Sequence, residues 1–469
     1  MAQKKRVSRR RTATCSVRRS RTRGAQDDND SCDLAVKDEP GLSVMATVYV
    51  KAKHVAARTS HYVFNQLIPY IGNKRKLLDL IQSALGHTEA TPGSTFVDLF
   101  AGSGVVSRLA KTLGYRVISN DWEPYTIPIN TCYVACNAAP LFSGLGGYAS
   151  AIDALNGVPP LDGWITRHLC PRNDEHYDSD RERMFYMRKN GMRIDAIRER
   201  IQAWKEDCLI SDDEECCLIA PLLYQACYTS NTSGVFKGFH RGWGGQTATA
   251  LYRIAGDLRL APAVFFDNEL QNKVTCLDAQ TLAEQMRDEE VAVAYIDPPY
   301  NQHPYGSNYH VLNTITLWDQ PETSRLIERG TKSAIRTDWR TSRRSAYNSR
   351  HSAPAAYAEL LDSLRAHFIL TSYSTDGTVP LRDVLAANAR LGDVRLELRG
   401  YKRYRVSSQR FSLKPMNIEF VVILDKHRRP SASVDDLVDR VMSAEKSVLA
   451  NHPERNGEPV AQLSFLEEK

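Results

Sequence analysis

The chain has 469 residues, of which 42% are hydrophobic and 25% charged, as in ordinary globular proteins. It has no run of about 18 apolar residues and no apolar segment behind its N-terminal charges, so we expect no membrane span, no secretory signal and a cytoplasmic location. The net charge is +6, but residues 1–26 carry ten basic side chains and no acid, which leaves −4 on the remainder. Any surface for a polyanion on the folded part must therefore be local.

Residues 1–45 begin with a basic stretch rich in Arg and Ser, which an acidic cluster at 27–30 follows, and this composition predicts a disordered tail. Three explanations stay open. The tail contacts phosphates non-specifically, or it follows from a start assigned upstream of a real one at Met45, or it is an organellar transit peptide. The first two are favoured equally, and the third less.

The first ordered region, residues 61–130, has the pattern of half of a doubly wound α/β fold. Residues 95–100 read as a strand, 101–104 as a glycine turn, 105–113 as a helix and 117–119 as a second strand. The second strand ends in an acid, Asp121. Strand, glycine turn, helix, strand and acid are the parts of a nucleotide-binding unit.

The next clear strand, 291–296, follows only about 170 residues later, too far for a single crossover. Residues 131–270 are therefore predicted to be an insertion, mainly helical, with helices at 193–203 and 214–228 and a glycine-rich aromatic stretch at 234–245. Residues 271–425 form the second half of the α/β fold, with further strands at 367–373, 394–399 and 418–424. Residues 426–469 hold a peripheral helix, 434–449, and a tail.

The most informative residues follow the strand 291–296, which ends abruptly in Asp297-Pro298-Pro299-Tyr300. Two prolines form a stiff corner without backbone donors. Such a corner holds the Asp297 carboxylate and the Pro298 carbonyl side by side, where together they accept both hydrogens of a planar amino group. Tyr300 can lie against the attached ring. This arrangement exposes the nitrogen lone pair and suggests methylation of a base amine.

The glycine turn Gly102-Ser103-Gly104 lets a ligand approach the backbone, and a carboxylate such as Asp121 at the next strand end binds ribose hydroxyls. The third glycine of a dinucleotide motif is missing, because Ser107 and Arg108 stand in that region. The pattern favours a nucleoside with a compact tail over a pyrophosphate.

With segments 70–74, 98–104, 120–121 and 297–300 in this order, the sequence resembles the Dam-like, alpha-group DNA adenine-N6 methyltransferases over about residues 64–425. The resemblance implies a Rossmann-like doubly wound methyltransferase sheet, an inserted target-recognition domain, S-adenosyl-L-methionine as cofactor and double-stranded DNA as substrate. It assigns cofactor binding to Tyr70, Lys74, Phe100, Gly102, Gly104, Asp121 and Asp278, and catalysis to Asp297, Pro298 and Tyr300. Ala101 departs from Dam itself, which has a larger residue there.

A base amine inside a duplex must be flipped out to reach such a pocket, so phosphate-binding cations and aromatic walls are expected. The residues predicted to contact DNA lie in the glycine-rich stretch and in two basic segments, 325–350 and 399–414: Lys237, Arg241, Trp243, Arg336, Arg340, Arg403 and Arg405. The alternative for the aromatic residues of 234–245 is a small core beneath a glycine-rich loop.

Several alternatives remain open from the sequence. The same corner serves cytosine N4, an RNA adenine or a protein glutamine amide, and a catalytically inactive, sequence-specific DNA-binding protein is a further reading. The scattered cysteines and histidines predict no metal site. We expect a monomer, and a cognate restriction endonuclease, a phage role or solitary action all fit the sequence.

Overall fold

The computed structural model describes residues 59–300, 304–328, 333, 339, 343–402 and 416–450, all within one compact unit of residues 56–469. The predictions for the tail 1–45, and for Arg336, Arg340, Arg403 and Arg405, lie outside the described residues. None of the helices in the described ranges combines the length and the apolar character that a membrane crossing needs.

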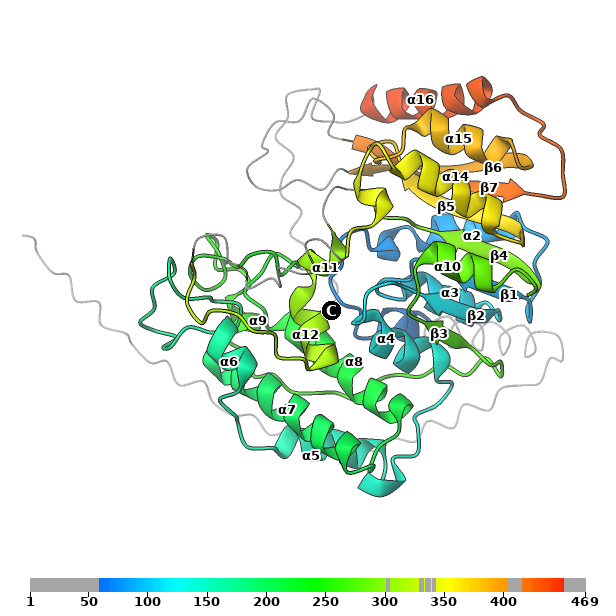
Figure 1. Ribbon diagram of the computed structural model, residues 1–469. Helices are drawn as coiled ribbons and strands as arrows, with labels where there is room; N and C mark the ends of the chain where they lie inside the picture. Colours follow the sequence, from blue (N-terminus) through cyan, green and yellow to red (C-terminus); the bar gives the residue numbers. More distant parts are fainter. Residues whose placement is uncertain are drawn as a thin grey trace, which may run out of the picture. The chain divides into compact units, whose positions relative to one another are not determined.

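A seven-stranded, mainly parallel sheet forms the centre of the α/β part (Figure 1). Its strands are β1 (Thr95–Asp98), β2 (Arg116–Asn120), β3 (Lys273–Thr275), β4 (Val291–Ile296), β5 (Ala366–Ser374), β6 (Asp393–Lys402) and β7 (Met416–Asp425). The spatial order is β3-β2-β1-β4-β5-β7-β6, and β7 runs in the direction opposite to the other strands of the sheet. The order reverses between β1 and β4, which is where open α/β sheets bind ligands.

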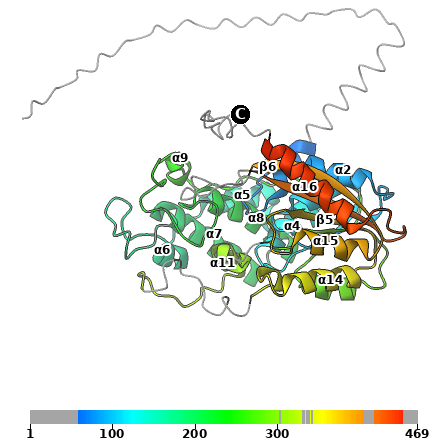
Figure 2. The same cartoon turned by 90° about the horizontal axis from the view of Figure 1, so that it is seen from above.

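Both faces of the sheet's central strands are buried, because their side chains alternate between two cores. Phe96 and Val293 point into one core with α2 (Leu78–Gly86) and α3 (Val105–Thr112). Val97 and Ala294 point into the other. That core is covered by α10 (Ala279–Gln285), α14 (Ala353–Ser363), α15 (Leu381–Ala389) and α16 (Val434–Ala450), and Figures 1 and 2 show α14, α15 and α16 side by side.

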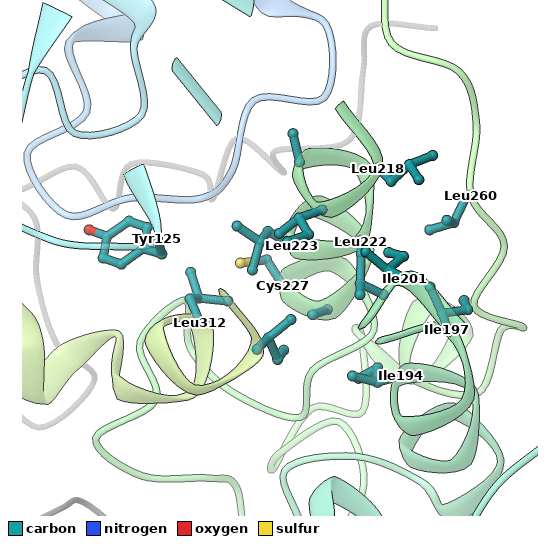
Figure 3. Close-up of a cluster of buried hydrophobic side chains, with 14 of the residues drawn as sticks. Tyr125, Ile194, Ile197, Ile201, Leu218, Leu222, Leu223, Cys227, Leu260 and Leu312 are labelled. Atoms are coloured by element: carbon teal, nitrogen blue, oxygen red, sulfur yellow. The ribbon is translucent and has the colours of Figure 1, made fainter. Parts of the chain in front are cut away.

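The chain between β2 and β3 is largely helical. It contains α4 (Thr126–Asn130), a π-helix (Thr131–Ala135), α5 (Tyr148–Gly157), α6 (Trp164–Leu169), α7 (Arg188–Glu206), α8 (Asp212–Tyr228) and α9 (Leu251–Ile254). A third core surrounds α8, where side chains of α7, α8 and the segment around Leu260 meet (Figure 3). Leu312 of α12 (His310–Leu317) packs into this core although α12 follows the Asp-Pro-Pro-Tyr corner.

Every strand and helix expected from the sequence is present, with its ends moved by a few residues. The sharing of the third core by α12, and by α11 (Tyr305–Asn308) beside it, was not expected. The helical part is therefore built from two stretches of chain. The Asp-Pro-Pro-Tyr corner lies directly before the second of them.

Candidate active site

A pocket opens at the carboxyl ends of β1, β2 and β4. Open α/β sheets bind their ligands at this edge. Of the ten residues predicted for cofactor binding and catalysis, seven line it: Tyr70, Phe100, Asp121, Asp278, Asp297, Pro298 and Tyr300. The other three, Lys74, Gly102 and Gly104, contact the lining residues or shape the turn beneath them.

The Asp-Pro-Pro-Tyr corner is organised around an ion pair. Nζ of Lys74 lies 2.9 Å from Oδ1 of Asp297, and the side chains are 3% and 16% exposed. No described donor is aligned with that Oδ1 for a hydrogen bond. The carboxylate is thus held in place by the charge of the buried Lys74 ammonium group.

The protonation states of the corner follow from burial and mutual charge. Burial favours the neutral amine of Lys74, but Asp297, Tyr300 and Glu419 outweigh it and raise the pKa of Lys74 well above its usual value. Burial raises the pKa of Asp297, and Lys74 opposes that shift. Lys74 also favours the phenolate of Tyr300, but burial and the nearby carboxylates raise the pKa of Tyr300 to about 12. Lys74 is therefore a cation and Tyr300 a neutral phenol at neutral pH.

The glycine turn needs its glycines. Gly104 has φ +76°, and a Cβ placed there would lie 2.2 Å from Oδ1 of the buried Asn130. Gly102 has φ +51°, and a Cβ there would lie 2.8 Å from the ring of Tyr70. L-residues rarely adopt this backbone conformation, so both positions are restricted by strain and by space.

Asp121 holds this turn to the end of β2. Its Oδ2 accepts the backbone N–H of Gly102 at 2.8 Å and its Oδ1 that of Glu123 at 2.9 Å. Burial raises the pKa of Asp121 to about 6, against the opposing effect of these amides. Asp278 lies across the pocket as the N-cap of α10 and accepts the N–H of Gln280.

A second group of pocket residues was not predicted from the sequence. Glu123 accepts a hydrogen bond from Asn313 of α12 at 2.8 Å and lies 3.7 Å from a guanidinium nitrogen of Arg343. Burial raises the pKa of Glu123 to about 7. Tyr347 packs edge-on against Phe100, with ring centroids 5.6 Å apart. No local sequence signal marks them, because their partners are distant in the chain.

Asp98 supports the glycine turn from beneath the sheet edge. Ser107 Oγ donates to its Oδ2 at 2.7 Å, while its buried Oδ1 has no partner among the described residues. Burial raises the pKa of Asp98 from 3.8 to about 7. Burying such a carboxyl costs little free energy while it is protonated and more once it is ionised.

This burial predicts a pH-dependent stability that Asp98→Asn should remove. Between the unfolded pKa of 3.8 and the folded value of about 7, the folded protein binds more protons, so the contribution of Asp98 to stability falls as the pH rises. The free energy of unfolding of the variant minus that of the wild type should rise by about 2–4 kcal/mol between about pH 4 and pH 8. Urea unfolding at both pH values measures it, and a constant difference would show that Asp98 does not titrate in this way.

The described residues of the glycine-rich stretch are mostly structural. Phe236 and Phe239 are buried in the third core, as the alternative interpretation predicted. The indole N–H of Trp243 donates to the carbonyl of Asp174 at 2.8 Å. Arg241 forms an exposed ion pair with Asp180 at 2.9 Å. Contact of Lys237, Arg241 and Trp243 with DNA stays a prediction.

The fold is a mixed α/β sheet of the methyltransferase-like class, with the pocket at the edge where such sheets bind ligands. A family model for the D12 class N6 adenine-specific DNA methyltransferases matches residues 70–351. This chain belongs to that family. The match spans both halves of the sheet's ligand-binding edge and the helical segment between them.

Characterised relatives agree with this assignment. The type II methyltransferase M.NlaIII of Neisseria lactamica is 30% identical over 361 residues, covering 76% of this chain and 99% of that protein. The type II methyltransferase M.CviAII of Paramecium bursaria Chlorella virus 1 is 29% identical, with 72% and 93% covered. The modification methylase LlaI of Lactococcus lactis subsp. lactis is 27% identical, with 79% and 58% covered.

Among solved structures, the rRNA methyltransferase AviRa from Streptomyces viridochromogenes matches at 12% identity, covering 74% of this chain and 83% of that one. The TM-score is 0.21, so this likeness carries no argument.

Proposed function

We propose that this protein transfers a methyl group from S-adenosyl-L-methionine to the N6 amine of an adenine flipped out of double-stranded DNA. The observation that carries the proposal is the ion pair between the buried Lys74 and Asp297, beside Pro298 and Tyr300, at a pocket that Asp121 also lines. Family membership supplies the class of reaction. The residue roles below are part of the proposal.

The pocket fits the cofactor on the chemistry of its donor set. Phe100 and Tyr347 offer aromatic faces, and Asp121 presents a carboxylate at the end of β2. The adenine amine of the cofactor would meet Asp278, and its ribose hydroxyls Asp121. When bound, S-adenosylmethionine supplies a methyl group activated by the sulfonium charge.

The corner's own residues prepare the target amine. The Asp297 carboxylate and the Pro298 carbonyl accept its two hydrogens, which frees the nitrogen lone pair for attack. Lys74 keeps the carboxylate in position, and Tyr300 supports the base ring. Asp297 need not be a strong base, because the amine becomes acidic only as it is methylated and a proton can then pass to water. Fixing both reactants in contact supplies much of the rate.

We assign target recognition to the helical part, residues 131–270, acting as one monomeric enzyme on double-stranded DNA. Its position between the cofactor half and the catalytic corner supports this, as do its packing contacts with α12. The names of the relatives M.NlaIII and LlaI favour a modification enzyme. Action alongside a restriction endonuclease, in the cytoplasm, is part of the proposal.

Methyl transfer from labelled S-adenosylmethionine to DNA, RNA and protein acceptors, with digestion of the product to nucleosides, tests the proposal. We expect N6-methyladenine from duplex DNA. Label in N4-methylcytosine, in RNA or in protein would overturn the substrate, and binding of DNA without any transfer would revive the inactive, DNA-binding alternative.

A further inference from the structure

A second groove lies outside the pocket and shares one wall with it. Tyr70 lines both, and the segment continues from the pocket at Gly72 into the groove at Asn73, Arg75 and Lys76. The groove is larger than the pocket and open to solvent. It is therefore continuous with the site through the residues that position Lys74.

The two sides of the groove come from different parts of the fold. One side is residues 67–76 together with Tyr401 of β6. The other is the C-terminal end of α8, the loop 230–234 and Arg253 of α9. They approach each other where a Cβ on Gly234 would lie 3.9 Å from Pro69. A ligand in the groove therefore touches the catalytic part and the helical part together.

The lining has the chemistry of a polyanion site. Arg75, Lys76 and Arg253 contribute three cations, and no Asp or Glu occurs among the described residues that line the groove. The other polar lining groups are mainly hydroxyls: Tyr70, Tyr224, Tyr228, Tyr401, Ser230, Thr232 and Ser233. Because residues 59–469 carry both signs of charge throughout, this local excess marks the groove as distinct.

Several of these side chains are fixed in position. Arg253 donates to the carbonyls of Ser230 at 2.9 Å and Thr232 at 3.4 Å. Tyr224 and Tyr228 stack with centroids 6.1 Å apart. Arg75 stacks on Phe64 with 5.0 Å between guanidinium and ring centroid. Burial raises the pKa of Tyr224, and the nearby Arg75 opposes that shift. The surface is thus largely preformed.

We infer that this groove binds the sugar–phosphate backbone next to the flipped adenine, with phosphates at Arg75 and Lys76. The inference rests on the proposed function and extends it. A flipped nucleotide stays covalently linked to its neighbours, so their phosphates must lie close to the pocket wall. Lys, Arg, Tyr, Ser and Thr side chains are the usual partners of phosphate oxygens. The groove would also bring the strand against the helical part that selects the target.

The test compares the salt dependence of DNA binding in Arg75→Gln/Lys76→Gln and in wild type. Binding of a fluorescent DNA duplex is measured by anisotropy over a series of KCl concentrations, with S-adenosylhomocysteine present. The slope of log K against log salt is negative, and each lost phosphate contact reduces its magnitude by about 0.9. We therefore expect the magnitude to be about 1.8 smaller in the double variant. The control is Arg382→Gln/Arg390→Gln at α15, two exposed arginines in surface ion pairs, with an unchanged slope.

The outcomes separate the groove from the proposed function. Calorimetric binding of S-adenosylmethionine and a thermal scan establish that the variant is folded, and the single variants Arg75→Gln and Lys76→Gln replace it if it is not. A wild-type slope in the folded variants would overturn the groove assignment even if the wild type methylates DNA. A wild type that methylates no DNA would contradict the proposed function instead, whatever the slopes show.

Discussion

Asp297→Asn should lower the rate of methyl transfer by about a thousandfold or more while S-adenosylmethionine still binds. Asparagine keeps the shape of the carboxylate and one acceptor oxygen but removes the negative charge, so the positive charge that develops on the amine nitrogen during transfer is stabilised less. The substitution also removes the counter-ion of Lys74, 2.9 Å away. Single-turnover transfer to duplex DNA measures the chemical step, and calorimetry measures binding of the cofactor.

Loss of the buried ion pair also costs stability, so activity must be separated from folding. A thermal scan of Asp297→Asn establishes which fraction of the variant is folded at the assay temperature. Glu419 of β7 also raises the pKa of Lys74, so the lysine keeps a second carboxylate nearby when Asp297 is replaced. A folded variant with wild-type transfer would remove Asp297 from the chemistry.

Gly104→Ala should destabilise the protein by about 2–5 kcal/mol and abolish cofactor binding. An alanine at this position must adopt the left-handed backbone conformation of Gly104, and its Cβ would lie 2.2 Å from Asn130 Oδ1. The matched control is Gly86→Ala at the end of α2, where a Cβ has no neighbour within 4 Å. That variant should be neutral or slightly more stable, and chemical denaturation measures both.

A second background divides strain from crowding. In Asn130→Ala the clashing oxygen is gone, so the added cost of Gly104→Ala should fall to the backbone component, about 1–2 kcal/mol. An equal cost of Gly104→Ala on both backgrounds would show that Asn130 does not crowd the turn.

The sheet was largely predictable because its central strands are buried on both faces. The apolar run 291–296 and the flanking turns identify β4 without knowledge of the fold, and β1, β2, β5, β6 and β7 follow in the same way. β3 was missed because it has three residues, none of them buried. Its place in the sheet is determined by pairing with β2, which no local pattern encodes.

The site was predictable where its residues follow a strand end. Asp121 and Asp297 do so, and the pocket brings them together. Glu123 and Arg343 were not predictable, because their contact joins residues 220 positions apart. Likewise, the groove combines Arg75 with the end of α8, and only the packing of the helical part against residues 67–76 creates it.

The central claim is tested most directly by expressing the protein in a host that lacks adenine methylation and sequencing its DNA with a long-read method sensitive to modified bases. Asp297→Asn serves as the parallel control. We predict N6-methyladenine in one short sequence motif, absent with the variant. DNA without methyladenine from a folded, cofactor-binding wild type, or the same mark with the variant, would contradict the account.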